Sequence, residues 1–118
     1  THLFVKKWAR QKQLFLPVIQ DGKMYIKAYT DEKDMAEGSF KILEPQTLLF
    51  GDINQIDVFV IPAVAFDKQN NRLGRGKGFY DKLLCLVSAY KIGIAYPEQI
   101  VDVIPTEKHD IKMDIILY

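Results

Sequence analysis

The chain has 118 residues, of which 48% are hydrophobic and 26% charged, and its formal net charge is +1. This length suits one domain and hardly two, and the composition is that of an ordinary soluble globular protein. A charge so close to zero excludes a global field that recruits nucleic acid or anionic membranes, so any anion site must be local.

The single cysteine, Cys85, excludes an internal disulfide and suits a reducing compartment. A run of about 18 apolar residues, which would predict a membrane span, is absent from the sequence. We therefore expect one cytoplasmic domain over residues 1–118 with no membrane partner.

The first half of the chain predicts a helix and a β-hairpin. In His2–Gln13, apolar residues recur at helical spacing, and the lysines and arginine between them form a solvated face. Leu14–Ile19 and Met24–Tyr29 have strand patterns, and the turn signal Asp21-Gly22 joins them. The polar segment Asp31–Asn54 reads mostly as loop, with a short helix around Asp31–Met35.

The second half predicts alternating strands and a helix. Asp57–Ile61 is β-branched and uninterrupted, as is typical of a strand covered on both faces. A loop (Ala63–Gly78) and a helix (Gly78–Ala89) follow it. Two further strands are predicted at Lys91–Ala95 and Asp114–Tyr118. This order predicts a right-handed βαβ crossover in a parallel sheet, and such sheets bind ligands beyond the carboxyl ends of their strands.

A loop rich in glycine and basic residues follows the strongest strand. Gly74-Arg-Gly-Lys-Gly78 alternates three glycines with Arg75 and Lys77, and Arg72 lies just before it. Glycine lets backbone N–H groups approach an anion, and the predicted helix would point its positive end at the same place. The segment therefore predicts a site for polyphosphate.

This signal is weak when it is taken alone. The loop matches neither the Walker A pattern nor the dinucleotide fingerprint, and the alternative is a flexible basic turn at the surface. Asp81, in the first helical turn, could hold magnesium beside the phosphates or simply stabilise the helix dipole. Asp67 is equally ambiguous.

A longer motif carries a resemblance. Asp57–Asp67 followed by Asn71–Asp81 resembles the signature of the 5-formyltetrahydrofolate cyclo-ligase family, which has Phe-Asp and then Arg-x-Gly-x-Gly-x-Gly-Tyr-Tyr-Asp. The stretches Leu43–Pro45, Ile92–Ala95 and His109–Asp114 are also similar to the family, so that the resemblance covers most of the chain.

The resemblance implies both a fold and a reaction. We expect an α/β fold with an open, mostly parallel twisted sheet and flanking helices, in a Rossmann-like three-layer arrangement. The family uses ATP and Mg²⁺ to convert 5-formyltetrahydrofolate into 5,10-methenyltetrahydrofolate, with release of ADP and phosphate. No side-chain nucleophile is needed for this chemistry, and the sequence shows no catalytic triad pattern.

The resemblance also assigns site residues. Arg75 and Lys77 would be catalytic, and Asp81 and Asp110 would hold Mg²⁺. Folate would contact residues 75–79: Arg75, Gly76, Lys77, Gly78 and Phe79. ATP would be wrapped by residues 72–80: Arg72, Leu73, Gly74, Arg75, Gly76, Lys77, Gly78, Phe79 and Tyr80.

Departures from the family keep alternatives open. The basic N-terminal helix and the substrate-binding glutamate of the family have no counterpart here, which implies a fragment or a natural short form. Phe79 replaces the more usual tyrosine but keeps an aromatic face. A binding module without turnover is therefore the alternative to the enzyme. Nucleic-acid binding is a third reading, against which the near-zero charge argues.

Three further residues are open to interpretation. His109 reads as a surface histidine beside Asp110, and Cys85 as a small buried hydrophobe of the predicted helix. Trp8 could stack on a pteridine ring, although core or rim positions are more usual for such residues.

Overall fold

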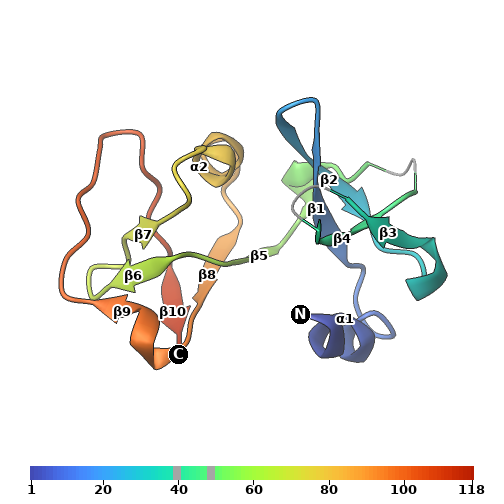
Figure 1. The fold of residues 1–118 in the computed structure, drawn as a ribbon, viewed down its shortest axis with the longest axis horizontal. Helices are drawn as coiled ribbons and strands as arrows, with labels where there is room; N and C mark the ends of the chain where they lie inside the picture. The colour runs from blue at the N-terminus through green and yellow to red at the C-terminus, as the bar shows by residue number, and fades with distance from the viewer. Residues whose placement is uncertain (39–40, 48–49) are drawn as a thin grey trace. The chain divides into compact units, whose positions relative to one another are not determined.

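The computed structural model describes residues 1–38, 41–47 and 50–118. It groups the chain into two compact units, Thr1–Gln55 and Ile56–Tyr118, each of which is described by itself (Figure 1). That both units belong to one domain stays a prediction. None of the described helices has the length and apolar character that a membrane span requires.

The first unit is built around a β-hairpin. Strand β1 (Phe15–Gln20) pairs antiparallel with β2 (Lys23–Ala28), which confirms the two predicted strands to within one residue. The connecting residues Asp21 and Gly22 both have positive φ, at 51° and 72°, as a tight two-residue hairpin turn requires. The β2 face that carries Ile26 is buried.

The remaining elements of this unit are short. Helix α1 (His2–Trp8) ends five residues before the predicted helix does, because Arg10 to Gln13 offer no apolar side chain to bury. The predicted short helix is a 3-10 turn at Glu32–Asp34. An antiparallel pair, β3 (Met35–Glu37) with β4 (Leu43–Pro45), lies in a segment that we had predicted as loop.

The second unit contains the predicted parallel sheet. Its strands are β5 (Val58–Ile61), β8 (Tyr90–Ile94) and β10 (Ile115–Leu117), in the order β10-β8-β5. Both pairings are parallel, and helix α2 (Phe79–Leu84) lies between β5 and β8 along the chain. The strand–helix–strand order is therefore confirmed.

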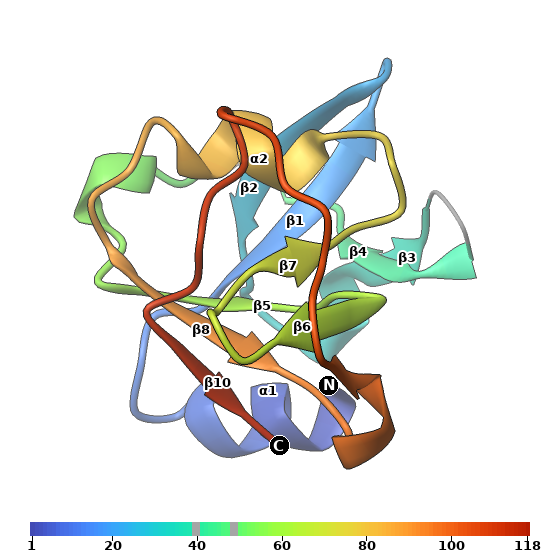
Figure 2. The same cartoon turned by 90° about the vertical axis from the view of Figure 1, so that its left-hand side faces the viewer.

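A second small sheet carries the loop of interest. Strand β6 (Ala65–Asp67) pairs antiparallel with β7 (Arg72–Leu73) and parallel with β9 (Ile100–Val101). The sequence pattern had predicted loop for β6 and β7. Figure 2 shows that the segment after β9 rises beside α2 and then returns to β10.

Two predictions about this unit are wrong. Helix α2 has six residues rather than twelve, because after Leu84 the chain turns with Leu86 and Val87 donating to carbonyls only three residues back. Leu86 is 66% exposed, so its apolar side chain does not extend the buried face. Strand β5 is covered on one face only, since Val58 and Val60 are exposed while Phe59 and Ile61 are buried.

The fold is thus mixed α/β, with parallel strands and few helices in the described residues.

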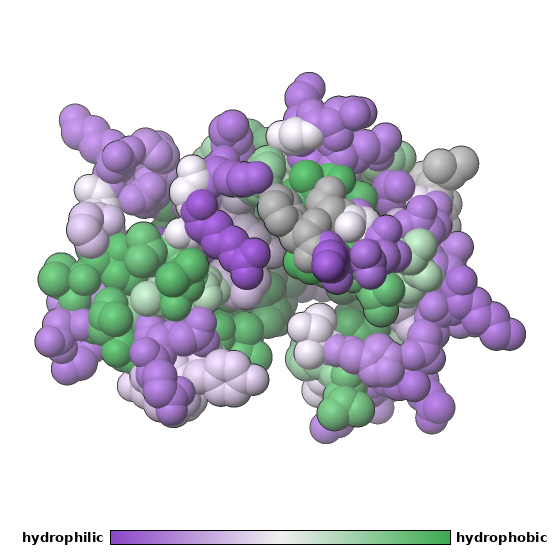
Figure 3. Space-filling view, in the orientation of Figure 1, coloured by the Kyte–Doolittle hydropathy of each residue, from purple (hydrophilic) through white to green (hydrophobic). Residues whose placement is uncertain are grey.

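Apolar surface is exposed elsewhere on the second unit as well. Figure 3 shows apolar side chains gathered over β6 and β9, where Val64, Val101 and Val103 are exposed.

A buried carboxylate, that of Asp67 at the end of β6, fastens this unit together. Asp67 is 1% exposed, and its Oδ1 accepts hydrogen bonds from the backbone N–H groups of Gln69 and Asn71, each at 2.9 Å. Its Oδ2 accepts from the side-chain amide of Asn71 at 2.9 Å and from the N–H of Ile104 at 3.0 Å. Burial raises the pKa of Asp67, but hydrogen bonds from Asn71, Ile104 and Gln69 lower it more, so that the pKa lies below its usual value.

We predict that Asp67→Asn lowers the free energy of unfolding by roughly 2–3 kcal/mol at pH 7, because one oxygen that accepts two hydrogen bonds becomes a donor. The ionised carboxylate stabilises the fold above its unfolded-state pKa of about 4, and this stabilisation is lost as pH falls through the folded-state pKa. The two proteins should therefore differ less in their free energy of unfolding, measured with urea, in acid than at pH 7.

The control is Asp102→Asn, because the Asp102 side chain is 98% exposed. We expect a change within about 0.5 kcal/mol for that substitution. Equal stability of Asp67→Asn and the unmodified protein at pH 7 would contradict the role given to Asp67.

Candidate functional site

The glycine-basic loop connects β7 to α2 and has the backbone shape that the sequence predicted at two of its three glycines. Gly76 and Gly78 have φ of 81° and 66°, a region that L side chains rarely adopt. Gly78 is also the N-cap of α2. The side chains of Arg75 and Lys77 are exposed on this loop. A positively charged, backbone-permissive segment therefore exists at the place predicted for phosphate.

Gly74 serves a different purpose in the same loop. A Cβ atom built on Gly74 would lie 3.0 Å from Nη1 of Arg72, so the guanidinium occupies the space that a side chain would need. Arg72 therefore turns back beneath the loop, and its side chain is only 5% exposed.

The buried guanidinium joins the two ends of the motif. Nη2 of Arg72 donates to Oδ2 of Asp81 at 3.1 Å, and the Asp81 side chain is 20% exposed. The guanidinium also lies 5.2 Å from the ring centre of Tyr80, at cation–π distance. Burial raises the pKa of Tyr80, with a smaller opposing effect of Arg72, so the phenol stays neutral near pH 7. We call this arrangement of Arg72, Tyr80 and Asp81 the clasp.

The clasp leaves two atoms unused within the described structure. Nε of Arg72 is buried and has no hydrogen-bond partner there. Oδ1 of Asp81 lies outside the ion pair with Arg72, which uses Oδ2. Asp81 can thus accept one further donor or cation without losing Arg72.

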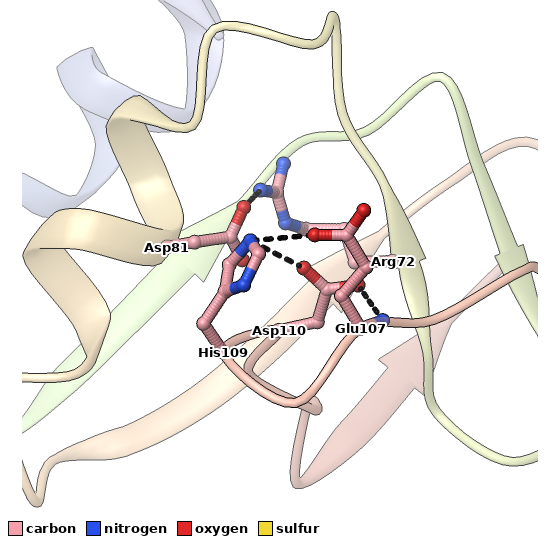
Figure 4. A network of polar contacts seen from close by, with 5 residues as sticks. All are labelled: Arg72, Asp81, Glu107, His109 and Asp110. Carbon is pink, nitrogen blue, oxygen red and sulfur yellow. Dashed lines mark hydrogen bonds and ion pairs between the residues drawn. The ribbon is translucent and has the colours of Figure 1, made fainter.

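A second acidic group comes from the segment after β9. Oδ2 of Asp110 accepts from the N–H of Glu107 at 2.8 Å, which closes a tight turn. Nε2 of His109 lies 3.2 Å from Oε2 of Glu107 and 3.6 Å from Oδ1 of Asp110. Figure 4 shows this turn facing the clasp, with His109 between Asp81 and Asp110.

The described residues contain no group of three His, Cys, Asp or Glu side chains that could hold a metal ion by themselves. Magnesium seldom requires one, since it is usually held by one or two carboxylates together with substrate phosphates and water. Oδ1 of Asp81 and the carboxylate of Asp110 meet that requirement, so these residues fit Mg²⁺ held jointly with a phosphate.

Several readings of single residues are now decided. His109 is a surface histidine, as predicted, with a side chain that is 71% exposed. Cys85 is exposed, so the prediction of a buried hydrophobe is wrong: it lies just past the end of the shortened helix. Asp67 is structural, because its buried carboxylate accepts the hydrogen bonds described above. Trp8 contacts Lys7 and Phe4 in the first unit, and a stacking role for it stays a prediction.

Sequence reasoning missed two features of the site. The pairing of Arg72 with Asp81 spans nine residues and depends on the β6–β7 hairpin, for which no strand was predicted. The bond from the N–H of Glu107 to Asp110 was also missed, and the only signal for it is that an acidic side chain can accept from the backbone three residues earlier, as in a capping box.

The chain is similar to known proteins along its whole length. The model of the 5-formyltetrahydrofolate cyclo-ligase family matches residues 1–118. A 5-formyltetrahydrofolate cyclo-ligase of Haemophilus influenzae is 38% identical over 120 residues, which cover 93% of this chain and 63% of the relative. One from Mus musculus is 33% identical over 137 residues, covering 100% of this chain and 66% of the relative.

Solved structures agree with this similarity. A 5,10-methenyltetrahydrofolate synthetase of Aquifex aeolicus superposes with a TM-score of 0.84 at 30% identity, covering 98% of this chain and 59% of that one. A 5,10-methenyltetrahydrofolate synthetase from Mycoplasma pneumoniae superposes with a TM-score of 0.68 at 33% identity. This superposition covers 98% of this chain and 60% of that one. This chain therefore spans about two thirds of the length of these relatives or less.

We predict that Arg72 and Asp81 are energetically coupled. Arg72→Ala and Asp81→Asn should each lower the free energy of unfolding by about 3 kcal/mol, because each leaves a mostly buried charge without its partner. The double variant should lose about 1–2 kcal/mol less than the sum of the two single changes.

Urea unfolding of the four proteins measures this coupling. The matched control is Lys68→Ala with Asp102→Ala, a pair that is exposed and 4.0 Å apart, for which we expect no measurable coupling. Additive effects of Arg72→Ala and Asp81→Asn would show that the clasp does not act as a unit.

Proposed function

The chain belongs to the 5-formyltetrahydrofolate cyclo-ligase family, and we propose that it takes part in the ATP- and Mg²⁺-dependent conversion of 5-formyltetrahydrofolate into 5,10-methenyltetrahydrofolate. ADP and phosphate are the other products. The observation that carries this proposal is the loop of residues 74–78, whose exposed Arg75 and Lys77 flank Gly76, a glycine of positive φ, next to the clasp.

The loop supplies what a triphosphate needs. Gly76 and Gly78 let the backbone turn its N–H groups toward anionic oxygens, and Arg75 and Lys77 add positive charge. Since α2 has only six residues, little of the neutralisation comes from its dipole. ATP is bound in this proposal by Arg72 to Tyr80, with Arg72 contributing through the clasp and the exposed cations contacting the phosphates.

The folate is placed against the same loop. Arg75 to Phe79 would approach the formyl group, and Phe79 offers an aromatic face that is partly exposed. Arg75 and Lys77 would then act on both substrates, as a phosphoryl transfer between them requires.

The chemistry follows from the weakness of a formamide oxygen as a leaving group. Transfer of the γ-phosphoryl group from ATP to that oxygen releases ADP and gives an imidate phosphate. The second folate nitrogen then attacks the formyl carbon, the carbon–oxygen bond breaks, phosphate departs, and the nitrogen loses its proton. Both steps need positioning and charge neutralisation rather than a protein nucleophile, and Arg75 and Lys77 supply them.

Asp81 and Asp110 would hold Mg²⁺ together with the phosphates. When bound, the ion would neutralise charge on the transferring phosphoryl group. Arg72 orients Asp81 so that Oδ1 faces away from the ion pair, and the N–H of Glu107 fixes the carboxylate of Asp110.

The proposal also includes the three-layer arrangement that is expected of the family. The apolar residues Val58, Val60 and Ile94 are exposed on the parallel sheet, and such a face is normally packed against helices. This supports a Rossmann-like three-layer arrangement. A cytoplasmic location stays a prediction.

The alternative is a module that binds folate or nucleotide but does not turn them over. One observation favours this alternative: the chain spans 63% and 66% of the length of two relatives that are named 5-formyltetrahydrofolate cyclo-ligases. Binding without an ATP-dependent product would identify it.

We predict that the protein, mixed with 5-formyltetrahydrofolate, Mg²⁺ and ATP, produces the near-ultraviolet absorbance of methenyltetrahydrofolate, and that omission of ATP abolishes the signal. Arg75→Ala and Lys77→Ala should each lower the rate by roughly 10²-fold, because each removes charge stabilisation at the transferred group.

Arg10→Ala is the control, because it removes an exposed cation from a helix end outside the loop and should leave the rate unchanged. A flat trace from this chain would be followed by the same assay on the complete reading frame. Silence of that protein, when folded, would overturn the enzyme and favour the binding module.

A further inference from the structure

One face of the β1–β2 hairpin in the first unit carries two aromatic rings beside a buried lysine. Tyr25 and Lys27 are two residues apart on β2, so their side chains point to the same face of the hairpin. Phe50 forms an isolated antiparallel bridge with Lys27, which places its ring on that face as well. We call Tyr25, Lys27 and Phe50 the hairpin patch. None of these residues belongs to the site proposed for ATP, folate or Mg²⁺.

The two rings cover the lysine but are themselves open to a ligand. The ring centres of Tyr25 and Phe50 are 5.7 Å apart, with an angle of 68° between the rings, which is an edge-to-face arrangement. Nζ of Lys27 lies 5.2 Å from the centre of the Phe50 ring. Lys27 is only 8% exposed, whereas Tyr25 and Phe50 are 37% and 56% exposed. The patch therefore combines exposed aromatic surface with a largely buried cation.

Lys27 differs from the other buried charged side chains of the described residues. Glu44 accepts a hydrogen bond from the N–H of Ile19 at 3.2 Å, and Asp67 accepts the four hydrogen bonds described above. The ammonium group of Lys27 has the Phe50 ring as its contact and forms no ion pair with a carboxylate of the described residues. Since a buried lysine is almost always paired, because desolvation of its charge is costly, this missing partner indicates that an anion can bind here.

The charged groups around the patch limit the kind of anion. Asp52 lies two residues after Phe50 and accepts a backbone hydrogen bond at 3.0 Å. Asp21 in the hairpin turn and the exposed Lys23 carry opposite charges at the other end of the same strand. Neither aspartate forms an ion pair with Lys27 among the described residues. The surroundings therefore have no strong net charge that would attract a polyanion, and recognition depends on direct contact with one ammonium group.

We propose that the hairpin patch binds a small aromatic carboxylate. The carboxylate pairs with Nζ of Lys27, and the ring of the ligand packs against the exposed sides of Tyr25 and Phe50. An inorganic or aliphatic anion would gain the charge contact without the ring contacts. Three side chains are too small an area for a protein interface, which buries about 800 Å² on each partner. The proposal is independent of the proposed function, so neither depends on the outcome of the other.

Binding is measured on the whole 118-residue chain, labelled with ¹⁵N and titrated with 2-naphthoate while the backbone amide shifts are followed. Two matched compounds separate the contributions. The neutral 2-naphthamide keeps the ring and loses the charge, and cyclohexanecarboxylate keeps the charge and loses the aromatic ring. We expect 2-naphthoate to bind roughly tenfold more tightly than either compound, with the largest shifts in β2 and at Phe50.

Lys27→Met removes the charge and keeps an unbranched apolar side chain in its place. This variant should bind 2-naphthoate roughly tenfold more weakly and 2-naphthamide unchanged, because only the charge contact is lost. The matched control is Lys23→Met, which removes an exposed lysine from the same face of the same strand and should change neither affinity. Amide spectra of both variants without ligand check that the fold is retained.

Equal affinities of the unmodified protein for 2-naphthoate and 2-naphthamide would overturn the proposal, and this comparison needs no variant to fold. Equal affinities for 2-naphthoate and cyclohexanecarboxylate would overturn the aromatic specificity. Shifts confined to residues outside the hairpin and Phe50 would show that the compound binds elsewhere. An equal loss of affinity in Lys27→Met and Lys23→Met would contradict the role of Lys27.

Discussion

The second unit depends on one buried carboxylate. Asp67 accepts two backbone hydrogen bonds from its own turn, which fixes the hairpin between β6 and β7. A third backbone bond, from Ile104, holds the start of the segment that leads to Asp110. The same turn holds the end of that segment, because the carbonyl of Asn70 accepts from the N–H of Met113 at 2.9 Å. A single short turn therefore fastens both ends of the loop opposite the clasp.

The clasp extends this constraint to the glycine-basic loop. The β6–β7 register sets Phe66 opposite Arg72, so the position of the guanidinium follows from that of the turn. Arg72 then fixes Asp81 at the start of α2. Both predicted metal-binding carboxylates are thus positioned from one place, although Asp81 and Asp110 are 29 positions apart in the sequence. A fold of short strands achieves this through side-chain hydrogen bonds rather than through long regular elements.

The sequence predicted what depends on local pattern and missed what depends on tertiary contacts. The alternation in Met24–Tyr29 and the run Asp57–Ile61 located β2 and β5, and the turn at Asp21 followed from residue type alone. Strand β6 was missed because its three residues gain their stability from β7 and β9 rather than from an extended pattern. Helix α2 was overestimated because Cys85 and Leu86 match the apolar spacing although the tertiary structure leaves both exposed. Arg72 belongs to the predicted motif, but only the fold shows that its guanidinium turns inward.

The inward turn of Arg72 divides the cations of the loop into two kinds. Arg72 is ordered before any ligand binds, because burial and Asp81 already restrict its side chain. Arg75 is exposed on a glycine-rich segment and would lose conformational freedom on contact with an anion. This loss costs roughly 1–2 kcal/mol for each long side chain, so the loop binds less tightly than its charge alone suggests. The preorganised part of the proposed site is therefore formed by the clasp and the Asp110 turn, whereas Arg75 would become ordered only around a ligand.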